Sequence, residues 1–311
     1  MSSEHLNRRE LLALSGAAVA AQVLLRPGLL FAQAATTRSA STVDHRYKIS
    51  AADWMMLKRQ TPGALDRGKE CGLDGVEVDM GPLGNRPTFE NKLRDEKFRT
   101  DYLAKAKDNN LAISSFAMSA FYGQPVADHP KAEEFCAEWI DLMPKLGTKV
   151  GFLPVIFKKE DDSDAAIAKV VGLMKKVAPK AESTGVVIGL STPLNAEANV
   201  KLLDDIGSPA VQIAYNCGEA VDDKRDPLVE LKTLGQKRIA EIIPTLSDGK
   251  WLQNDNRMDV PKLKQLLDEM GWSGWLVLQR SRDAAKARDV KYNFSANAAY
   301  LKSIFQAAEK S

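Results

Sequence analysis

Short runs rich in β-branched and apolar residues alternate with longer segments of helical period along most of the chain. In the longer segments apolar residues recur every three or four positions, which is typical of helices with one buried face. The short runs are typical of buried strands. Eight runs are predicted to be strands: Tyr47–Ala52, Gly75–Met80, Leu111–Met118, Lys149–Ile156, Val186–Thr192, Val211–Asn216, Arg238–Thr245 and Gly274–Gln279.

Several of the intervening helices have recognisable ends. One is predicted to begin at Asp128 and Pro130 and to end at Gly147, because Asp and Pro favour helix starts and Gly favours helix ends. A second is predicted to begin at Ser163 or a neighbouring Asp, a third spans 259–271, and the last spans 286–308. The inward faces of the first three are expected to carry Phe135, Trp139, Leu142, Leu146, Ile167, Val170, Val171, Met174, Val177, Leu263, Leu266, Leu267 and Met270.

Consecutive strand and helix units predict the fold class. Eight such units imply a parallel α/β sheet closed into a single (β/α)8 TIM barrel over residues 47–311, because each crossover is right-handed and closure leaves no exposed edge. The alternative is a doubly wound open sheet. Such a sheet normally carries a glycine-rich phosphate turn after its first strand, whereas this chain continues with Asp53-Trp54.

The composition narrows the class of protein further. The 311 residues are 44% hydrophobic, which excludes a disordered chain, and the net charge of +2 gives no basic excess for nucleic acid. A small molecule is therefore the expected partner. Cys71, Cys136 and Cys217 are too few for a disulfide scaffold, so we expect them to be buried as small apolar residues.

The first 34 residues have the pattern of a twin-arginine signal peptide. Arg8 and Arg9 precede an apolar stretch over 11–25, and Ala32-Gln33-Ala34 supplies a cleavage site before Ala35. The pattern predicts export to the periplasm or beyond, followed by a flexible segment over 35–46. No second apolar run approaches membrane length, so we expect no stable membrane insertion after cleavage. The alternative is an uncleaved amphipathic helix.

Several acidic residues fall where a barrel places its chemistry, at the carboxyl ends of the strands. Asp53 ends the first strand, and a period of two puts Glu77 and Asp79 of the second strand on one face. These carboxylates are candidate catalytic bases, with Arg280 or Arg282 stabilising an oxyanion. A structural role as buried, paired charges is an equally good interpretation.

Aromatic and amide side chains near the strand ends suit the faces and hydroxyls of a sugar. Trp54 follows the first strand, and Trp251 lies in a polar loop that follows the seventh. After the third strand come Phe116, Met118, Phe121 and Tyr122, which could wall a pocket but are more typical of core.

Three segments carry a resemblance to a known family: Val187–Leu190 with the helix ending at 202–206, Gln212–Ala220, and Gly271–Gln279. Together with 234–239 they resemble the xylose isomerase-like sugar phosphate isomerase/epimerase superfamily of TIM barrels over nearly all of the chain after the signal. Members typically hold a divalent metal through Glu, Asp, His and Glu near the ends of strands five to eight. The resemblance places those positions at Ser191, Asn216, a neutral residue near Ile243, and Gln279. A site without carboxylates binds Mg²⁺ or Mn²⁺ poorly, so we expect no metal and no other cofactor; the alternative is that a divalent metal such as Mn²⁺ or Mg²⁺ is still bound.

Three functions follow from these patterns. The first is a metal-independent enzyme on a sugar or cyclitol derivative. The second is a non-catalytic carbohydrate-binding pseudoenzyme that holds its ligand through Trp54, Ser191, Asn216, Trp251 and Gln279. The third, an endonuclease at abasic sites, fits badly with the near-neutral charge and the export signal. The oligomeric state is left open.

Overall fold

A computed structural model describes residues 45–157 and 163–307 of the chain. The predicted signal peptide and all but the last two residues of the predicted 35–46 segment lie outside the described residues. None of the helices within the described ranges combines the length and the apolar character needed to cross a membrane.

Eight parallel strands form a closed barrel in chain order, β1 to β8, and each predicted strand is confirmed to within two residues at either end. The β1–β8 ladder closes the ring, with Tyr47 opposite Gly274 and Ala51 opposite Leu278. This closure confirms the single (β/α)8 barrel and excludes the open sheet. The strands are β1 Tyr47–Ala52, β2 Gly75–Asp79, β3 Ala112–Ala117, β4 Val150–Pro154, β5 Val187–Ser191, β6 Val211–Asn216, β7 Ile239–Ile243 and β8 Gly274–Leu278.

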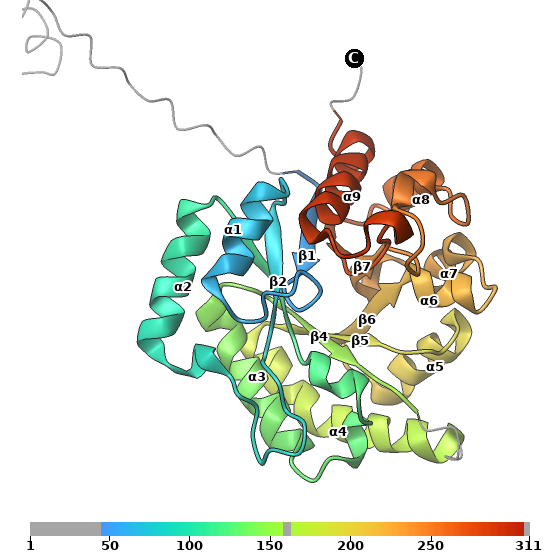
Figure 1. The fold of residues 1–311 in the computed structure, drawn as a ribbon. Coiled ribbons are helices and arrows are strands. Elements are labelled where there is room, and N and C mark those ends of the chain that lie inside the picture. Colours follow the sequence, from blue (N-terminus) through green and yellow to red (C-terminus); the bar gives the residue numbers. More distant parts are fainter. Residues whose placement is uncertain (1–44, 158–162, 308–311) are drawn as a thin grey trace, which may run out of the picture. The chain divides into compact units, whose positions relative to one another are not determined.

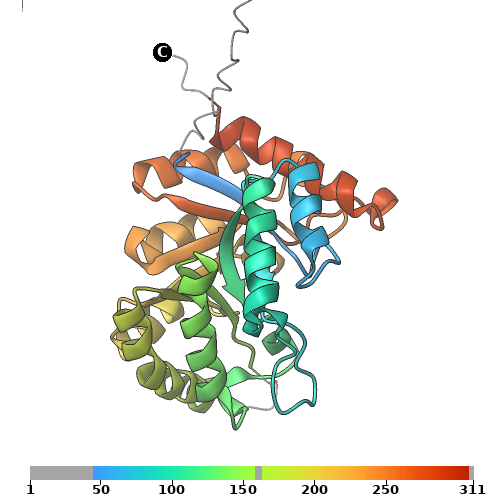
Figure 2. The ribbon, with the colours of Figure 1, turned by 90° about the vertical axis from the view of Figure 1, so that its left-hand side faces the viewer.

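Helices surround the strands, and the last helix, α9, packs beside β1 and α1 where the ring closes (Figure 1). The loop after β2 stands out from the body of the barrel (Figure 2). The α-helices are α1 Pro62–Glu70, α2 Glu96–Asp108, α3 Ala132–Leu146, α4 Ser163–Thr184, α5 Ala196–Ile206, α6 Cys217–Asp222, α7 Pro227–Leu234, α8 Val260–Glu269 and α9 Val290–Phe305. Short 3-10 helices include η2 Ser119–Tyr122, η3 Val126–Asp128 and η5 Leu252–Asn254.

Two predicted helix starts are wrong. The helix expected from Asp128 begins at Ala132, because the residue before Pro130 is driven into extended backbone and Asp128 ends η3 instead. The last helix begins at Val290, since the side chain of Asp289 accepts a hydrogen bond from Tyr292 N and caps the helix there. The predicted end at Gly147 is confirmed, with the glycine in the left-handed conformation at φ 72°.

The main core lies between the strands and the helices. Trp139 of α3 is completely buried there, and its indole Nε1 donates a hydrogen bond of 2.7 Å to Phe116 O. The ring lies directly over Gly151 of β4, where a Cβ would come within 2.2 Å of it. All three cysteines are free and buried, as expected.

We therefore expect Gly151→Ala to lower the free energy of unfolding by about 1–3 kcal/mol, because the added methyl group forces the Trp139 ring out of its packed position. Gly172→Ala is the matched control. Gly172 lies on the exposed side of α4 with no atom near its missing Cβ, so alanine there should raise stability by up to about 1 kcal/mol. Urea unfolding measures both, and equal effects would contradict this packing role.

A smaller cluster fills the inside of the barrel. Ala117, Phe152, Ala214, Ile243 and Val277 are all buried there, one from each of five strands. The partly buried Trp54 and Trp275 pack against this cluster. The cluster separates the candidate site from the amino-terminal end of the barrel.

Candidate active site at the carboxyl ends of the strands

Two aromatic side chains, packed on the buried Phe152, form one wall of a mouth at the carboxyl ends of the strands. Trp54, just after β1, stacks at 30° on Phe152 of β4, with ring centroids 6.2 Å apart. Tyr122 of η2 lies 6.1 Å from the same Phe152 ring. Tyr122 is 39% exposed, whereas Phe116, Met118 and Phe121 beside it are buried in the core. Tyr122 and the partly buried Trp54 are therefore the rings of this wall that a ligand can reach.

The floor of the mouth carries uncharged hydrogen-bonding groups. The Tyr122 hydroxyl donates to Gln279 Oε1 at 3.4 Å and lies close to Ser191 and Glu219. Gln279 is only 5% exposed, and its Nε2 points the other way, toward the barrel centre. Ser191 is 3% exposed, and among the described residues its Oγ has no hydrogen-bond partner of regular geometry. The Ser191 hydroxyl lies beside the Tyr122 hydroxyl, and a ligand hydroxyl would give it a partner of regular geometry.

Below the floor lies a pair of buried carboxyl groups, Glu77 of β2 and Glu241 of β7. Glu77 Oε2 accepts a hydrogen bond from Gln279 Nε2 at 3.4 Å, and Oε1 accepts one from Ser115 Oγ at 3.1 Å. Glu241 lies against Glu77 and Ser115, yet neither of its oxygens has a hydrogen bond of regular geometry to a described residue.

Both carboxyl groups have pKa values above the usual value for glutamate. Burial, and then repulsion from Glu241, raises the pKa of Glu77 well above its usual value. Burial raises the pKa of Glu241 to about 7. The two side chains are completely buried, and Gln279 links Glu77 to the mouth by a hydrogen bond.

The rim of the mouth contains a more accessible carboxyl group, Glu219 of α6. Asn216, the last residue of β6, caps this helix by accepting hydrogen bonds from Gly218 N and Glu219 N, and its Nδ2 donates to Glu219 Oε1 at 3.1 Å. Burial raises the pKa of Glu219 to about 7, and Arg225 and Arg280 limit the rise. A half-buried carboxyl group that titrates near neutrality can both accept and donate a proton.

Asp53 and Asp79, which were candidate catalytic bases, form hydrogen bonds and an ion pair that hold loops in place. Asp79 accepts hydrogen bonds from Gly81 N and Ser119 N, and its carboxylate pairs with Arg59 Nε at 3.1 Å. Asp53 Oδ2 accepts from Gln60 N at 2.8 Å. Burial is the main cause that raises the pKa values of both carboxyl groups. Asp79 is the last residue of β2, and the chain turns at Gly81 directly after it, so the Asp79 carboxylate lies against the loop.

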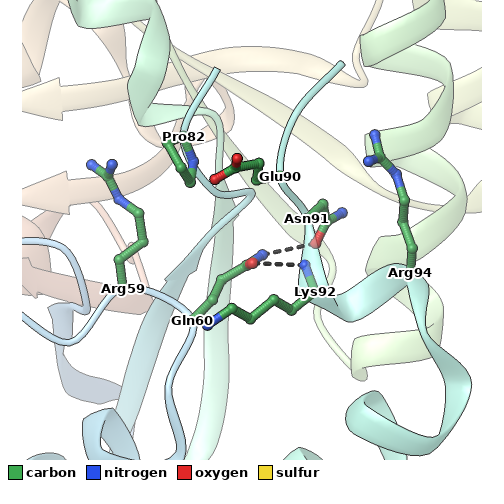
Figure 3. Close-up of a pocket in the computed structure, with 7 residues that line it drawn as sticks. All are labelled: Arg59, Gln60, Pro82, Glu90, Asn91, Lys92 and Arg94. Atoms are coloured by element: carbon green, nitrogen blue, oxygen red, sulfur yellow. Dashed lines mark hydrogen bonds between the residues drawn. The ribbon is translucent and has the colours of Figure 1, made fainter. Parts of the chain in front are cut away.

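A pocket of about 590 Å³ lies beside these loops, lined in part by Arg59, Gln60, Lys92 and Arg94. Figure 3 shows the Gln60 amide pointing at Asn91 and at the backbone of Lys92, to which it is hydrogen bonded at 2.7 and 2.9 Å. Arg94 is paired with Glu138 of α3. These contacts tie the long loop after β2 to α3 and hold that side of the mouth in place.

The structure brings together five of the residues named from sequence as ligand contacts: Trp54, Ser191, Asn216, Gln279 and Arg280. Glu77 lies directly beneath them, while Asp53 and Asp79 hold loops. Trp251 lies elsewhere, against Tyr292 of α9, because Leu252 N donates to Asn297 Oδ1 and ties this loop to the helix.

Sequence reasoning missed Glu219 and Glu241. Glu219 stands three residues after a helix-capping Asn216, which is the ordinary pattern of a capping box. The resemblance places a family site position at a neutral residue near Ile243 and gives Glu241 no role. An acid two residues before Ile243 in a strand shares its inward face, and this period was the available signal.

The mouth does not have the donor set of a divalent metal site. Asn216 uses its amide to cap α6 and to donate to Glu219, and Gln279 turns its N–H toward Glu77. Within residues 45–157 and 163–307, no group of three or more His, Cys, Asp or Glu side chains is arranged to hold a metal ion.

Comparison with known proteins places this geometry in context. A family model described as "Xylose isomerase-like TIM barrel" matches residues 65–304. A search among curated proteins found no match. A sugar phosphate isomerase/epimerase from Parabacteroides distasonis is 18% identical, with a TM-score of 0.65 over 86% of this chain and 97% of that chain.

Two similar solved structures contain sugars. D-psicose 3-epimerase from Clostridium cellulolyticum, solved with D-tagatose, is 15% identical, with a TM-score of 0.66 over 83% of this chain and 99% of that one. D-allulose 3-epimerase from a Methylomonas species, in complex with D-allulose, is 14% identical, with a TM-score of 0.64 over 84% and 98%. At these identities the likeness shows the fold.

Proposed function

Because the chain belongs to the xylose isomerase-like TIM barrel family, we propose that it binds a sugar or sugar derivative in the mouth and isomerises or epimerises it without a divalent metal. The observation that carries the proposal is the position of Glu219, a titratable group on the rim of a mouth whose other contacts are aromatic rings, hydroxyls and amides. Sugars bound to similar folds support the ligand class.

Each part of the mouth has a role in this proposal. Trp54 and Tyr122 pack against the sugar ring, and Ser191 and Gln279 Oε1 bind its hydroxyls. The Glu219 carboxylate removes the proton from the carbon next to the carbonyl group, and the electron pair moves onto the carbonyl oxygen. Arg280 stabilises that oxygen. For an isomerisation, Glu219 returns the proton to the former carbonyl carbon, and the hydroxyl proton of the first carbon passes to the former carbonyl oxygen as the first carbon becomes the new carbonyl. For an epimerisation, a water molecule on the opposite face protonates the original carbon, the carbonyl group re-forms, and the resulting hydroxide takes the proton from Glu219.

We propose that no metal is bound because the side chains at the expected ligand positions carry no negative charge. Ser191, Asn216 and Gln279 are neutral, and the amide oxygens of the last two already accept hydrogen bonds from Gly218 N, Glu219 N and the Tyr122 hydroxyl. Hard cations prefer anionic oxygen, so this set favours a neutral ligand over Mg²⁺ or Mn²⁺.

Deuterium incorporation in D2O tests the function. We expect the full chain, treated with EDTA, to bind at least one of D-tagatose, D-allulose and D-fructose and to exchange its proton next to the carbonyl group, as measured by saturation-transfer and one-dimensional proton NMR. Equal rates with and without EDTA are expected. Exchange that requires added Mn²⁺ would contradict the metal-free mechanism, and an absence of sugar binding would contradict the function.

The alternative is a non-catalytic carbohydrate-binding barrel. It is favoured by the complete burial of Glu77 and Glu241 and by the structural contacts of Asp53 and Asp79, which leave Glu219 as the accessible acid identified at the rim. In the same experiment this alternative predicts sugar binding without exchange.

A further inference from the structure

A second groove lies on the flank of the barrel, between the loop that contains η5 and the outer face of α9. Its volume is about 620 Å³, within the range typical of small-molecule sites. Trp251 and Gln253 line it from the loop, and Tyr292, Ser295, Tyr300 and Ser303 line it from the helix.

The chemistry of this lining is distinctive. Of its described side chains, none is charged, and three are Trp or Tyr rings. Trp251 and Tyr292 have centroids 6.3 Å apart at 52°, so they form an angled corner rather than a closed stack. Lys286 covers the Tyr292 ring at 3.9 Å on one side, which fixes its orientation. Tyr300 lies eight residues further along α9, about 12 Å from Tyr292.

The groove is also held rigidly. Leu252 N donates a hydrogen bond to Oδ1 of Asn297, a buried residue of α9. Asn297 Nδ2 in turn donates to Ser281 O. Gly249 forms a parallel bridge with Asp283, so the loop is fastened at Gly249 as well as at Leu252. A fixed corner of aromatic rings needs little ordering on binding, which favours affinity for a rigid ligand.

We propose that this groove is a second carbohydrate-binding site, separate from the mouth, for the uncharged sugar units of a glycan. Rings at both ends contact the apolar faces of the sugars, and the Ser295 and Ser303 hydroxyls and the Gln253 amide bind their hydroxyl groups. The lack of charge in the lining disfavours a phosphate or a nucleic acid. The site does not depend on the chemistry proposed for the mouth.

Affinity electrophoresis of the full chain through gels containing amylose, laminarin, xylan, galactomannan or hydroxyethylcellulose tests this proposal. We expect at least one of these neutral polysaccharides to retard the protein, and Trp251→Ala to weaken the retardation about tenfold. Ala299→Arg, which fills the groove from an exposed position without removing any packed group, should have the same effect. Leu57→Ala, on a residue that is 72% exposed elsewhere, should have none.

Proton exchange on the sugars that bind the mouth should be unchanged in Trp251→Ala and Ala299→Arg, which separates failure of this site from failure of the mouth. Retardation that neither variant alters would overturn the proposal, as would the absence of retardation by all five polysaccharides. A concentration-dependent dimer in sedimentation, abolished by Ala299→Arg, would assign the groove to a second copy of the chain and overturn it as well.

Discussion

Glu241→Gln is expected to make the protein about 3 kcal/mol more stable than the wild type at pH 8 and to leave it nearly unchanged at pH 4. The folded-state pKa of Glu241 is about 7, against 4.5 in the unfolded chain. The folded protein therefore binds this proton more tightly, and its stability falls as the pH rises from 4.5 through 7. Each pKa unit corresponds to about 1.4 kcal/mol, which gives the expected difference. Glutamine keeps the shape and does not titrate.

Urea unfolding at several pH values measures this difference. Asp53, Asp79 and Glu77 also have raised pKa values, so the wild type loses further stability with rising pH. The difference between the two proteins removes these shared contributions and reports Glu241 together with its repulsion of Glu77. Glu134→Gln, on a carboxylate that is 71% exposed on α3, is the matched control and should follow the wild type at every pH. Parallel curves for Glu241→Gln and the wild type would mean that Glu241 is solvated in the folded protein.

The barrel could be predicted from sequence because its elements are separate in the chain and each has a strong period. The predicted bounds of β1 agree with the structure at both ends, and Gly147, in the left-handed conformation, ends α3 as predicted. The helix starts at Ala132 and Val290 were missed for a local reason. More than one residue near each start could cap a helix, and only the packed backbone selects among them.

The site was predicted less completely because a residue belongs to it only if its side chain points into the mouth, and the position in the sequence does not determine that. Glu77 and Asp79 lie two residues apart, but the turn at Gly81 takes the Asp79 carboxylate into the loop. Trp251 is in a loop that leaves the mouth and joins α9 through Asn297, a contact 45 residues away in sequence. In the sequence, Glu219 fits the pattern of a helix start capped by Asn216. The fold brings its carboxyl group near Tyr122 and Arg280.

Glu219→Gln is expected to reduce proton exchange on a bound ketose about 10²–10⁴-fold at pH 7, with little change in sugar affinity. The carboxyl group is the proton acceptor in the proposed mechanism, and the amide keeps its hydrogen bond from Asn216 but cannot take a proton. The wild-type rate should rise with pH through about 7 and then level off, because the ionised form of Glu219 is the active base. Proton NMR in D2O gives the rate, and saturation transfer gives the affinity.

Asp223→Asn is the matched control for this prediction. Asp223 raises the pKa of Glu219 and is itself exposed, so its loss should move the pH profile toward lower pH and leave the plateau rate unchanged. Glu77→Gln tests the buried carboxyl group separately, because Glu77 is completely buried and is hydrogen bonded to Gln279 of the mouth. If exchange survives in Glu219→Gln and is lost in Glu77→Gln, the base is Glu77, and the barrel must then open its floor to admit the sugar.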